Sequence, residues 1–310
     1  MAAQLPRILP FSPSAIAVAA DEIAAGGIVA VATETVYGLA ADARDAGAVA
    51  RIYAAKRRPS FNPLIVHVPD LAAAKCLAVF DADARMLAAR FWPGPLTLVL
   101  PLRQGSGIAS LATAGLDTLA VRVPAHRAML ALLQASGAPL AAPSANASNA
   151  ISPTRADHVA ASLGCRVPLI VDDGATSAGV ESTIVAGRTI LRPGPVTAEM
   201  LAEVLPVAPG RTAHVSAPGQ LALHYAPAKP LRLEATERRA GEWLIGFGEI
   251  AGDDTLSAAG NLVEAAARLF DALHRADASA CDQIAMAPVP ACGIGVAIND
   301  RLRRAATARP

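Results

Sequence analysis

The sequence predicts an α/β protein of two domains, and three observations carry this prediction. Short apolar runs alternate with stretches of helical periodicity, which is the pattern of an α/β fold with a mixed sheet. The chain has 310 residues, and single domains usually have roughly 100 to 200. Prolines recur and apolar runs are few over residues 207–229, which predicts an extended linker between the domains.

The first domain is expected over residues 1–206. Its apolar runs predict strands at 28–32, 64–68, 96–102, 119–123, 140–142 and 169–171. Apolar residues at helical spacing predict helices at 13–25, 46–57, 82–91, 127–135, 155–163 and 198–204. A smaller α/β layer is expected over residues 230–310, with strands at 230–233, 243–247 and 283–287 and helices at 262–274 and 293–305.

The charge balance argues against a protein that holds nucleic acid through its overall field. Lys and Arg number 27 against 26 Asp and Glu. Residues 1–228 carry +2 (17 minus 15) and residues 229–310 carry −1 (10 minus 11). Non-specific binding to a polyanion needs many more unpaired cations. Any contact with RNA is therefore expected to be local and weak.

The cysteines and the apolar segments predict a cytoplasmic protein without a membrane anchor. Four cysteines lie far apart and form no C-x-x-C pair, which argues against a zinc ribbon and a disulfide framework. The first residues show no secretory signal. No apolar run reaches the length of about 20 residues that a membrane span needs.

The predicted helix at 46–57 carries a lysine where an apolar residue is expected. Lys56 continues the face that apolar residues form in the preceding turns. Arg57 and Arg58 follow, and residues 46–69 hold four cations and no carboxylate. A bound anion would neutralise this cluster, but a solvated helix end, where the dipole favours cations, explains it equally well. Pro59 disfavours the helical conformation at Arg58, which is therefore expected to point away from the direction of Arg57.

Polar side chains share single faces of several predicted extended segments. Period two groups Thr33 with Thr35 and Tyr37, Thr118 with Arg122, and, if residues 143–146 are extended, Ser144 with Asn146. These faces meet water or a substrate, or they belong to ordinary turns and strand edges. His67 interrupts an apolar strand, and such a histidine is more often structural than a ligand.

The common signatures of nucleotide, hydrolase and metal sites are absent. The sequence has no G-x-x-x-x-G-K-[ST] loop, no G-x-S-x-G elbow and no H-E-x-x-H helix. Residues 246–251 imitate a dinucleotide-binding fingerprint, but Asp253 and Asp254 follow where a helix would have to begin.

Six segments of the first domain resemble the YrdC-like threonylcarbamoyl-AMP synthases in order and spacing. They are TETVYGL (33–39), KRRPSFNPLIVH (56–67), FWPGPLT (91–97), PSAN (143–146), GVEST (179–183) and LRPG (191–194). HYAP (224–227) and GIGVAINDR (293–301) resemble the longer, two-domain Sua-type members, so that the resemblance covers nearly the whole chain. Arg57 departs from the family, in which glycine is frequent at this position, but the K-x-R pair is intact.

The resemblance implies a YrdC-like twisted mixed sheet with a concave cationic cavity, and a smaller Rossmann-like C-terminal domain. It implies that the K-x-R pair, Lys56 and Arg58, and the S-x-N pair, Ser144 and Asn146, are catalytic and meet the nucleotide. The ATP-binding positions that it implies are Arg58, Asn62, Thr118, Ser144, Ser152, Arg192 and Tyr225. The threonine-binding positions are Thr35, His67, Arg122 and Ser182, with Tyr37 as a neighbour.

The implied activity is that of an L-threonylcarbamoyladenylate synthase, which converts L-threonine, bicarbonate and ATP to threonylcarbamoyl-AMP, pyrophosphate and water. A carbamate on the threonine amine is already an anion, so the site has to align two anions and needs no strong general base. Magnesium is expected to enter with ATP, mainly through phosphate and water ligands, and its protein ligands are unknown. The product is expected to pass to the machinery that modifies a tRNA adenosine next to the anticodon.

Two other functions compete with this reading. A module that binds double-stranded RNA or the ribosome would use the same cationic cavity, but the charge balance disfavours it. A carbamoyl-adenylate enzyme of hydrogenase maturation shares the fold, but such proteins carry additional zinc-binding and acylphosphatase segments that this chain lacks.

The linker is expected to act as a lid. The resemblance places Tyr225 against ATP, and an amphipathic aromatic side chain in a segment with little core of its own needs a partner. A lid at this place would keep water from a labile product. The alternative is that HYAP only docks the second domain.

Overall fold

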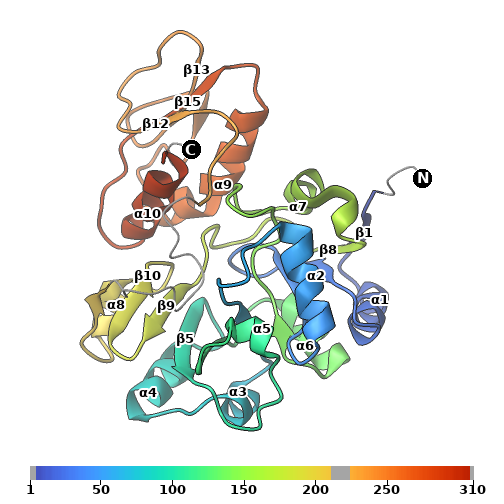
Figure 1. Cartoon of the computed structure of the whole chain (residues 1–310). Helices are drawn as coiled ribbons and strands as arrows, with labels where there is room; N and C mark the ends of the chain where they lie inside the picture. Colours follow the sequence, from blue (N-terminus) through green and yellow to red (C-terminus); the bar gives the residue numbers. More distant parts are fainter. Residues whose placement is uncertain (1–4, 211–223, 308–310) are drawn as a thin grey trace.

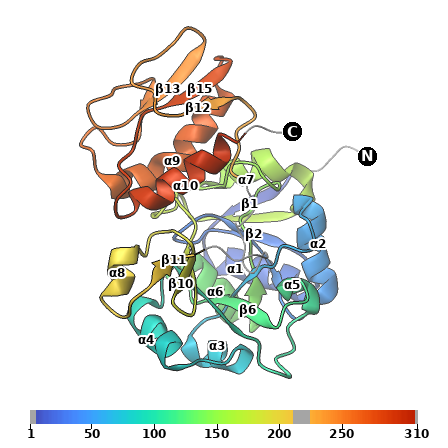
Figure 2. The same cartoon turned by 60° about the vertical axis from the view of Figure 1, so that its left-hand side comes forward.

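The computed structural model describes residues 5–210 and 224–307 (Figures 1 and 2). The strands of the first domain are β1 (Arg7–Pro10), β2 (Val29–Val31), β3 (Gly38–Asp42), β4 (Ile65–His67), β5 (Leu96–Pro101), β6 (Thr118–Arg122), β7 (Leu140–Ala141), β8 (Leu169–Asp172), β9 (Thr183–Ala186), β10 (Thr189–Arg192) and β11 (Ala208–Pro209). They form one sheet of 11 strands in the order β1-β8-β2-β3-β7-β4-β6-β5-β9-β10-β11. The sheet contains both parallel and antiparallel pairs, so the predicted mixed sheet is confirmed.

The helices of the first domain cover this sheet. They are α1 (Pro13–Ala24), α2 (Ala46–Lys56), α3 (Leu71–Leu77), α4 (Ala82–Phe91), α5 (Ser110–Thr113), α6 (Arg127–Ser136), α7 (Ala156–Leu163) and α8 (Ala198–Ala202), with a 3-10 turn at Gly164–Arg166. Strand β2 is covered by helices on both faces, so the side chains that alternate between these faces are all apolar. Val29 and Val31 pack in the cluster that includes α1 and α6, whereas Ala30 packs in the cluster of α2 and α7.

The second domain is a parallel sheet of four strands with two helices. Its elements are β12 (Leu231–Arg232), β13 (Glu242–Gly246), β14 (Asp254–Thr255), α9 (Leu262–Ala278), β15 (Gln283–Met286) and α10 (Gly295–Ala305). The strand order is β12-β15-β13-β14. No helix in the described part of the chain is long and apolar enough to cross a membrane.

The boundary between the first domain and the linker differs from the prediction. Residues 208–209, which the sequence assigned to an extended linker, form the edge strand β11 beside β10. An edge strand tolerates Pro209 because one side of it needs no partner for its backbone. Residues 211–223 of the predicted linker lie outside the described residues. The chain is described again from His224, which is half-buried and lines the cavity described below.

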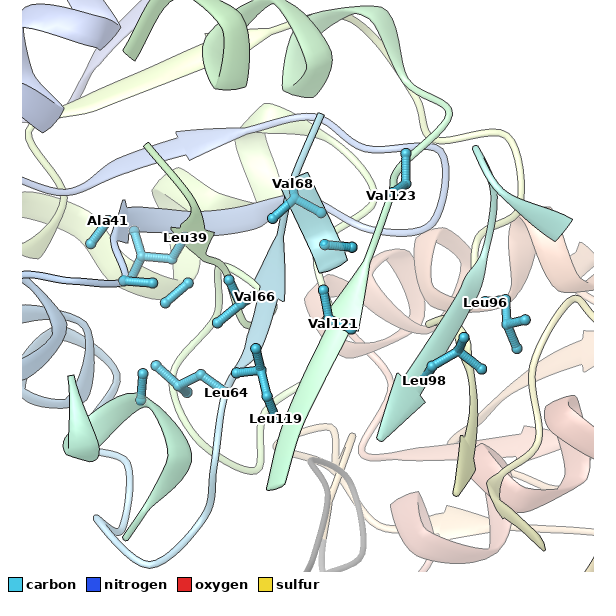
Figure 3. Packing of buried hydrophobic residues seen from close by; sticks show 14 of the residues in the cluster. Leu39, Ala41, Leu64, Val66, Val68, Leu96, Leu98, Leu119, Val121 and Val123 are labelled. Atoms are coloured by element: carbon cyan, nitrogen blue, oxygen red, sulfur yellow. The ribbon is translucent and has the colours of Figure 1, made fainter. Parts of the chain in front are cut away.

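The larger of the cores in the first domain packs residues of helices such as α2, α4 and α7 against one face of the sheet, and Figure 3 shows part of it. Val66 of β4, Val121 of β6 and Leu98 of β5 belong to this core. Because side chains alternate along a strand, the next residues, His67 and Arg122, emerge on the opposite face, and the parallel register sets them side by side. The fold thus brings two of the candidate site residues together.

The two domains share a second core. Val180 of the first domain and Tyr225 of the linker pack among residues of α9 and α10, such as Phe270 and Ile298. Helix α10 lies on the side of the second domain that faces the first, as both views show (Figures 1 and 2). The second domain is therefore joined to the first by apolar packing as well as by the linker.

Candidate active site

A cavity lies on the face of the first sheet opposite the core to which Val66, Val121 and Leu98 belong. Loops and strand ends from all parts of the first domain line it, together with the end of the linker. The candidate residues that line it are Thr35, Arg58, His67, Arg122, Ser144, Ser182, Arg192 and Tyr225. Four of them are the expected threonine-binding residues, so the structure brings that whole set together.

The threonine-binding candidates form a buried polar network. Arg122 donates from Nη1 to Thr35 Oγ1 at 3.0 Å and pairs through Nη2 with Glu34 Oε1 at 2.6 Å. Burial by itself would raise the pKa of Glu34, but the charge and hydrogen bond of Arg122 outweigh it and lower that pKa. Burial, with the charge of Arg122 adding to it, lowers the pKa of His67 to about 3. His67 is therefore neutral near pH 7.

Arg192, an expected ATP-binding residue, and Ser182, an expected threonine-binding residue, are hydrogen-bonded to each other in one wall of the cavity. Arg192 donates to the Ser182 carbonyl from Nε at 3.0 Å and from Nη2 at 2.9 Å, and to Ser182 Oγ at 3.1 Å. Thr97 Oγ1 lies 2.8 Å from the same Oγ. The hydroxyl of Ser182 is thus fixed by two side chains. An anion held by Arg192 would lie next to a ligand held by Ser182.

The K-x-R pair divides between the cavity and the core. Helix α2 ends at Lys56, and the left-handed backbone of the next residue, Arg57 (φ 53°), turns the chain out of the helix. Arg57 is exposed, whereas Arg58 lines the cavity and donates to the carbonyls of Asn62 and Pro63 at 3.1 and 2.9 Å. The predicted difference in direction is confirmed. Burial lowers the pKa of Arg58 to about 10, so the side chain keeps its charge near pH 7.

Lys56 takes a place that the sequence did not predict. It is buried and donates to the carbonyls of Ser144 and Asn146, and to Asn146 Oδ1 at 3.3 Å. Asn146 in turn donates to the Ala150 carbonyl at 2.8 Å. Of the S-x-N pair, Ser144 lines the cavity and Asn146 stands behind it. The structure thus satisfies Lys56 with backbone carbonyls, and its burial excludes the solvated helix end that the sequence left open beside a bound anion.

Four further candidates lie outside the lining. Ser152 is buried behind Glu181 and donates to its Oε1 at 2.5 Å. Asn62 is buried, and its Oδ1 has no partner among the described residues. Thr118 lies at the opposite end of β6 from Arg122, beside Pro101. Tyr37 points away from the cavity, since its hydroxyl donates to Asp172 Oδ1 at 2.9 Å and to the Gly174 carbonyl at 2.7 Å.

The structure adds three polar lining residues that the sequence did not assign, namely Thr33, Glu181 and His224. Each lies within a segment that resembles the family, and this was the feature of the sequence that could have identified it as a site residue. Burial, with nearby cations adding to it, lowers the pKa of His224 to about 3. Its ring meets that of Tyr225 edge-on, with centroids 4.0 Å apart.

The side chains at the cavity fit a metal ion that arrives with a nucleotide. In the described part of the chain, no three His, Cys, Asp or Glu residues are grouped to hold a metal. Among the described lining residues Glu181 is the carboxylate, and Ser152 and Arg301 already contact its two oxygens. A magnesium ion would therefore take its ligands from phosphates and water.

Two family models and several relatives match this chain. Residues 21–194 match the model of the Sua5, YciO and YrdC proteins, described as telomere recombination, and residues 196–307 match the threonylcarbamoyl-AMP synthase C-terminal domain. The threonylcarbamoyl-AMP synthase of Pyrococcus abyssi is 39% identical over 319 residues, which cover 94% of this chain and 93% of the relative. That of Bacillus subtilis is 39% identical over 335 residues, with coverages of 95% and 93%.

A solved structure agrees with these matches. The crystal structure of Pyrococcus abyssi Sua5 complexed with L-threonine superposes with a TM-score of 0.88 at 37% identity and covers 97% of each chain. The sequence similarity and the structural similarity thus both extend over the two domains. The chain therefore belongs to the two-domain Sua5 family of threonylcarbamoyl-AMP synthases.

Proposed function

We propose that this chain converts L-threonine, bicarbonate and ATP to threonylcarbamoyl-AMP, pyrophosphate and water. One observation carries the proposal. The expected threonine residue Ser182 and the expected ATP residue Arg192 are hydrogen-bonded to each other in one cavity wall. The similarity to relatives named as this synthase, and to a relative solved with L-threonine, supports the same activity.

The side chains around the cavity suit a reaction between two anions. The threonine amine and bicarbonate give a carbamate and water. A carbamate oxygen then bonds to the α-phosphorus of ATP while the bond to pyrophosphate breaks. Arg58 and Arg192 are charged groups on the lining that would stabilise the phosphate oxygens as this exchange proceeds. Because the carbamate attacks as an anion, the neutral His67 need not act as a base.

The proposed roles differ between the lining and the layer behind it. Thr35, His67, Arg122 and Ser182 would hold threonine, whereas Arg58, Ser144, Arg192 and Tyr225 would contact ATP. Lys56, Asn146 and Ser152 would act through the residues that they hold. We place Asn62 near the nucleotide through its unpaired Oδ1, and Thr118 is the ATP-binding expectation that the geometry supports least.

The proposal extends to magnesium, to the cytoplasm as the location of the protein and to tRNA as the acceptor of the threonylcarbamoyl group. The ion would enter with ATP and neutralise phosphate charge. Four free cysteines suit a reducing cytoplasm. The product would be transferred to tRNA by other proteins, and the small charge of both domains leaves at most a weak contact of this chain with RNA.

The proposal is tested with purified protein, ATP and magnesium. Pyrophosphate release is expected to need both L-threonine and bicarbonate, and mass spectrometry is expected to detect threonylcarbamoyl-AMP. Equal release without threonine would refute the proposal. An RNA-binding module would give no product and would retain RNA, and a carbamoyl-adenylate enzyme would not depend on threonine.

A further inference from the structure

A buried arginine of the second domain reaches the wall of the cavity. Arg301 of α10 is 0% exposed, although it belongs to the last helix of the chain. It donates from Nε to Glu181 Oε2 at 2.9 Å and from Nη1 to the Pro193 carbonyl at 2.7 Å. Its Nη2 lies 3.3 Å from the Glu181 carbonyl. One guanidinium group therefore binds two separate segments of the first domain.

Both of these segments carry candidate substrate contacts. Glu181 lines the cavity and precedes Ser182, and Pro193 follows Arg192. Arg301 thus contacts the residue next to each member of the wall that joins the two substrate positions. Its guanidinium carbon also lies 5.4 Å from the centroid of the Tyr225 ring, which lines the cavity as well.

The charge and the hydrogen bonds of Arg301 fix the orientation of its guanidinium group. A fully buried charge is costly unless it is paired and its donors are bonded, and Glu181 and the neighbouring Asp300 provide its carboxylate partners. Burial by itself would raise the pKa of Glu181, but the charges of Arg301 and Arg192 and the hydrogen bond from Ser152 hold it at about 2. The planar fork of arginine allows one orientation for this set of partners. Lysine at this position would reach fewer of them.

We propose that Arg301 is a positioning residue of the active site, through which the second domain fixes the cavity wall at Glu181, Ser182 and Arg192. The inference rests on the proposed function, because the effect concerns the substrates of that reaction. It makes the second domain a part of the catalytic unit. The ion pair between the exposed Arg155 and the half-buried Asp271, with an Nε–Oδ1 distance of 3.0 Å, also joins the domains but does not touch the cavity. It provides a matched control.

The test compares full-length Arg301→Met, Arg301→Lys, Glu181→Gln and the double variant Glu181→Gln/Arg301→Met. Arg155→Met controls for domain docking, and Arg303→Met controls for an exposed arginine on the same helix. Steady-state kinetics of threonylcarbamoyl-AMP formation and calorimetric binding of ATP and of L-threonine are measured below the unfolding temperature of each variant. Arg301→Met is expected to lower kcat/KM for ATP at least tenfold and to weaken ATP binding, with Arg301→Lys intermediate.

The double variant separates positioning from general destabilisation. Removing Arg301 alone leaves Glu181 buried without its main partner, so the double variant is expected to be more active than Arg301→Met. Both control variants are expected to keep wild-type kinetics. If folded Arg301→Met binds ATP and turns over like the wild type, the inference is wrong while the proposed function stands. If the wild type forms no product, the proposed function fails first, and unchanged ATP and threonine binding in Arg301→Met would then refute positioning independently.

Discussion

Two adjacent arginines have opposite surroundings, and this difference can be tested at the scale of single residues. Arg58 lines the cavity with its guanidinium held by two carbonyls, whereas Arg57 is exposed. Losing a donor that stabilises transition-state charge costs about 2 to 4 kcal/mol. Arg58→Ala is therefore expected to lower kcat/KM by about 30- to 1000-fold.

Arg57→Ala is the matched control for this substitution. It removes the same charge one residue away, and a surface change of this kind usually alters stability by no more than about 0.5 kcal/mol. The measurement is pyrophosphate release at saturating threonine and varied ATP. Equal activity of the two variants would show that the lining position of Arg58 has no part in the reaction.

At the scale of elements, the sequence predicted those helices and strands that have a clear apolar pattern. Helix α4 has its predicted bounds, and α2 ends one residue before its predicted end. Strand β3 (Gly38–Asp42) was not predicted, although Leu39, Ala40 and Ala41 form a short apolar run within it. The two-residue strands β11 and β14 are too short to produce any period.

The positions of the candidate site residues were likewise predicted where they depend on local geometry, and not where they depend on long-range contacts. Period two placed Arg122 opposite the core face correctly, since that rule depends only on local geometry. The partners of Lys56 and Arg301 could not be predicted, because both arise from tertiary contacts over long sequence separations. The sequence marked Lys56 as an anomaly but left a bound anion and a solvated helix end equally open, and it gave no sign of the backbone carbonyls that Lys56 contacts.

The contact of Lys56 with residues 144–146 joins the end of α2 to the loop after β7. Lys56→Met would leave the Asn146 carbonyl without its donor, whereas the Ser144 carbonyl would keep its hydrogen bond from Asn146 N at 3.0 Å. Such a loss costs about 1 to 3 kcal/mol. We expect the free energy of unfolding to fall by that order and the KM for ATP to rise, because Ser144 loses its support. Urea unfolding and steady-state kinetics measure the two effects.

Lys75→Met serves as the control, since Lys75 is exposed on α3 and its substitution is expected to change neither quantity. A Lys56→Met protein with normal stability and a raised KM would instead indicate direct contact with the nucleotide. Normal values of both would remove Lys56 from the site.

At the scale of the whole molecule, the two domains touch through the backbone at Gly179. Its φ is +69°, and a Cβ placed there would lie 2.2 Å from the Ala266 carbonyl oxygen and 2.4 Å from Ala267 Cα, both in α9. Glycine is therefore required twice, for its conformation and for the close approach of α9. The second domain can dock only because this position has no side chain.

Gly187 serves as a control in which the effect of backbone conformation can be measured without that of a close approach. Its φ is +55°, but a Cβ there would meet nothing within 4 Å. Gly187→Ala is expected to cost about 1 to 2 kcal/mol from conformation alone. Gly179→Ala has the same cost, and overpacking against α9 adds typically 1 to 3 kcal/mol. Because Gly179 lies two residues before Glu181, separating the domains would also release the wall that Arg301 holds.

We therefore expect Gly179→Ala to lose both stability and synthase activity, and Gly187→Ala to lose stability alone. Thermal unfolding gives the first quantity, threonylcarbamoyl-AMP formation the second, and small-angle scattering reports whether the domains have separated. If Gly179→Ala keeps wild-type kinetics while its radius of gyration increases, the cavity wall is complete without the second domain. If Gly179→Ala loses both stability and activity while Gly187→Ala loses stability alone, the close approach of α9 to residue 179 is needed for an ordered cavity wall. Domain docking and the order of the wall then depend on the same residues.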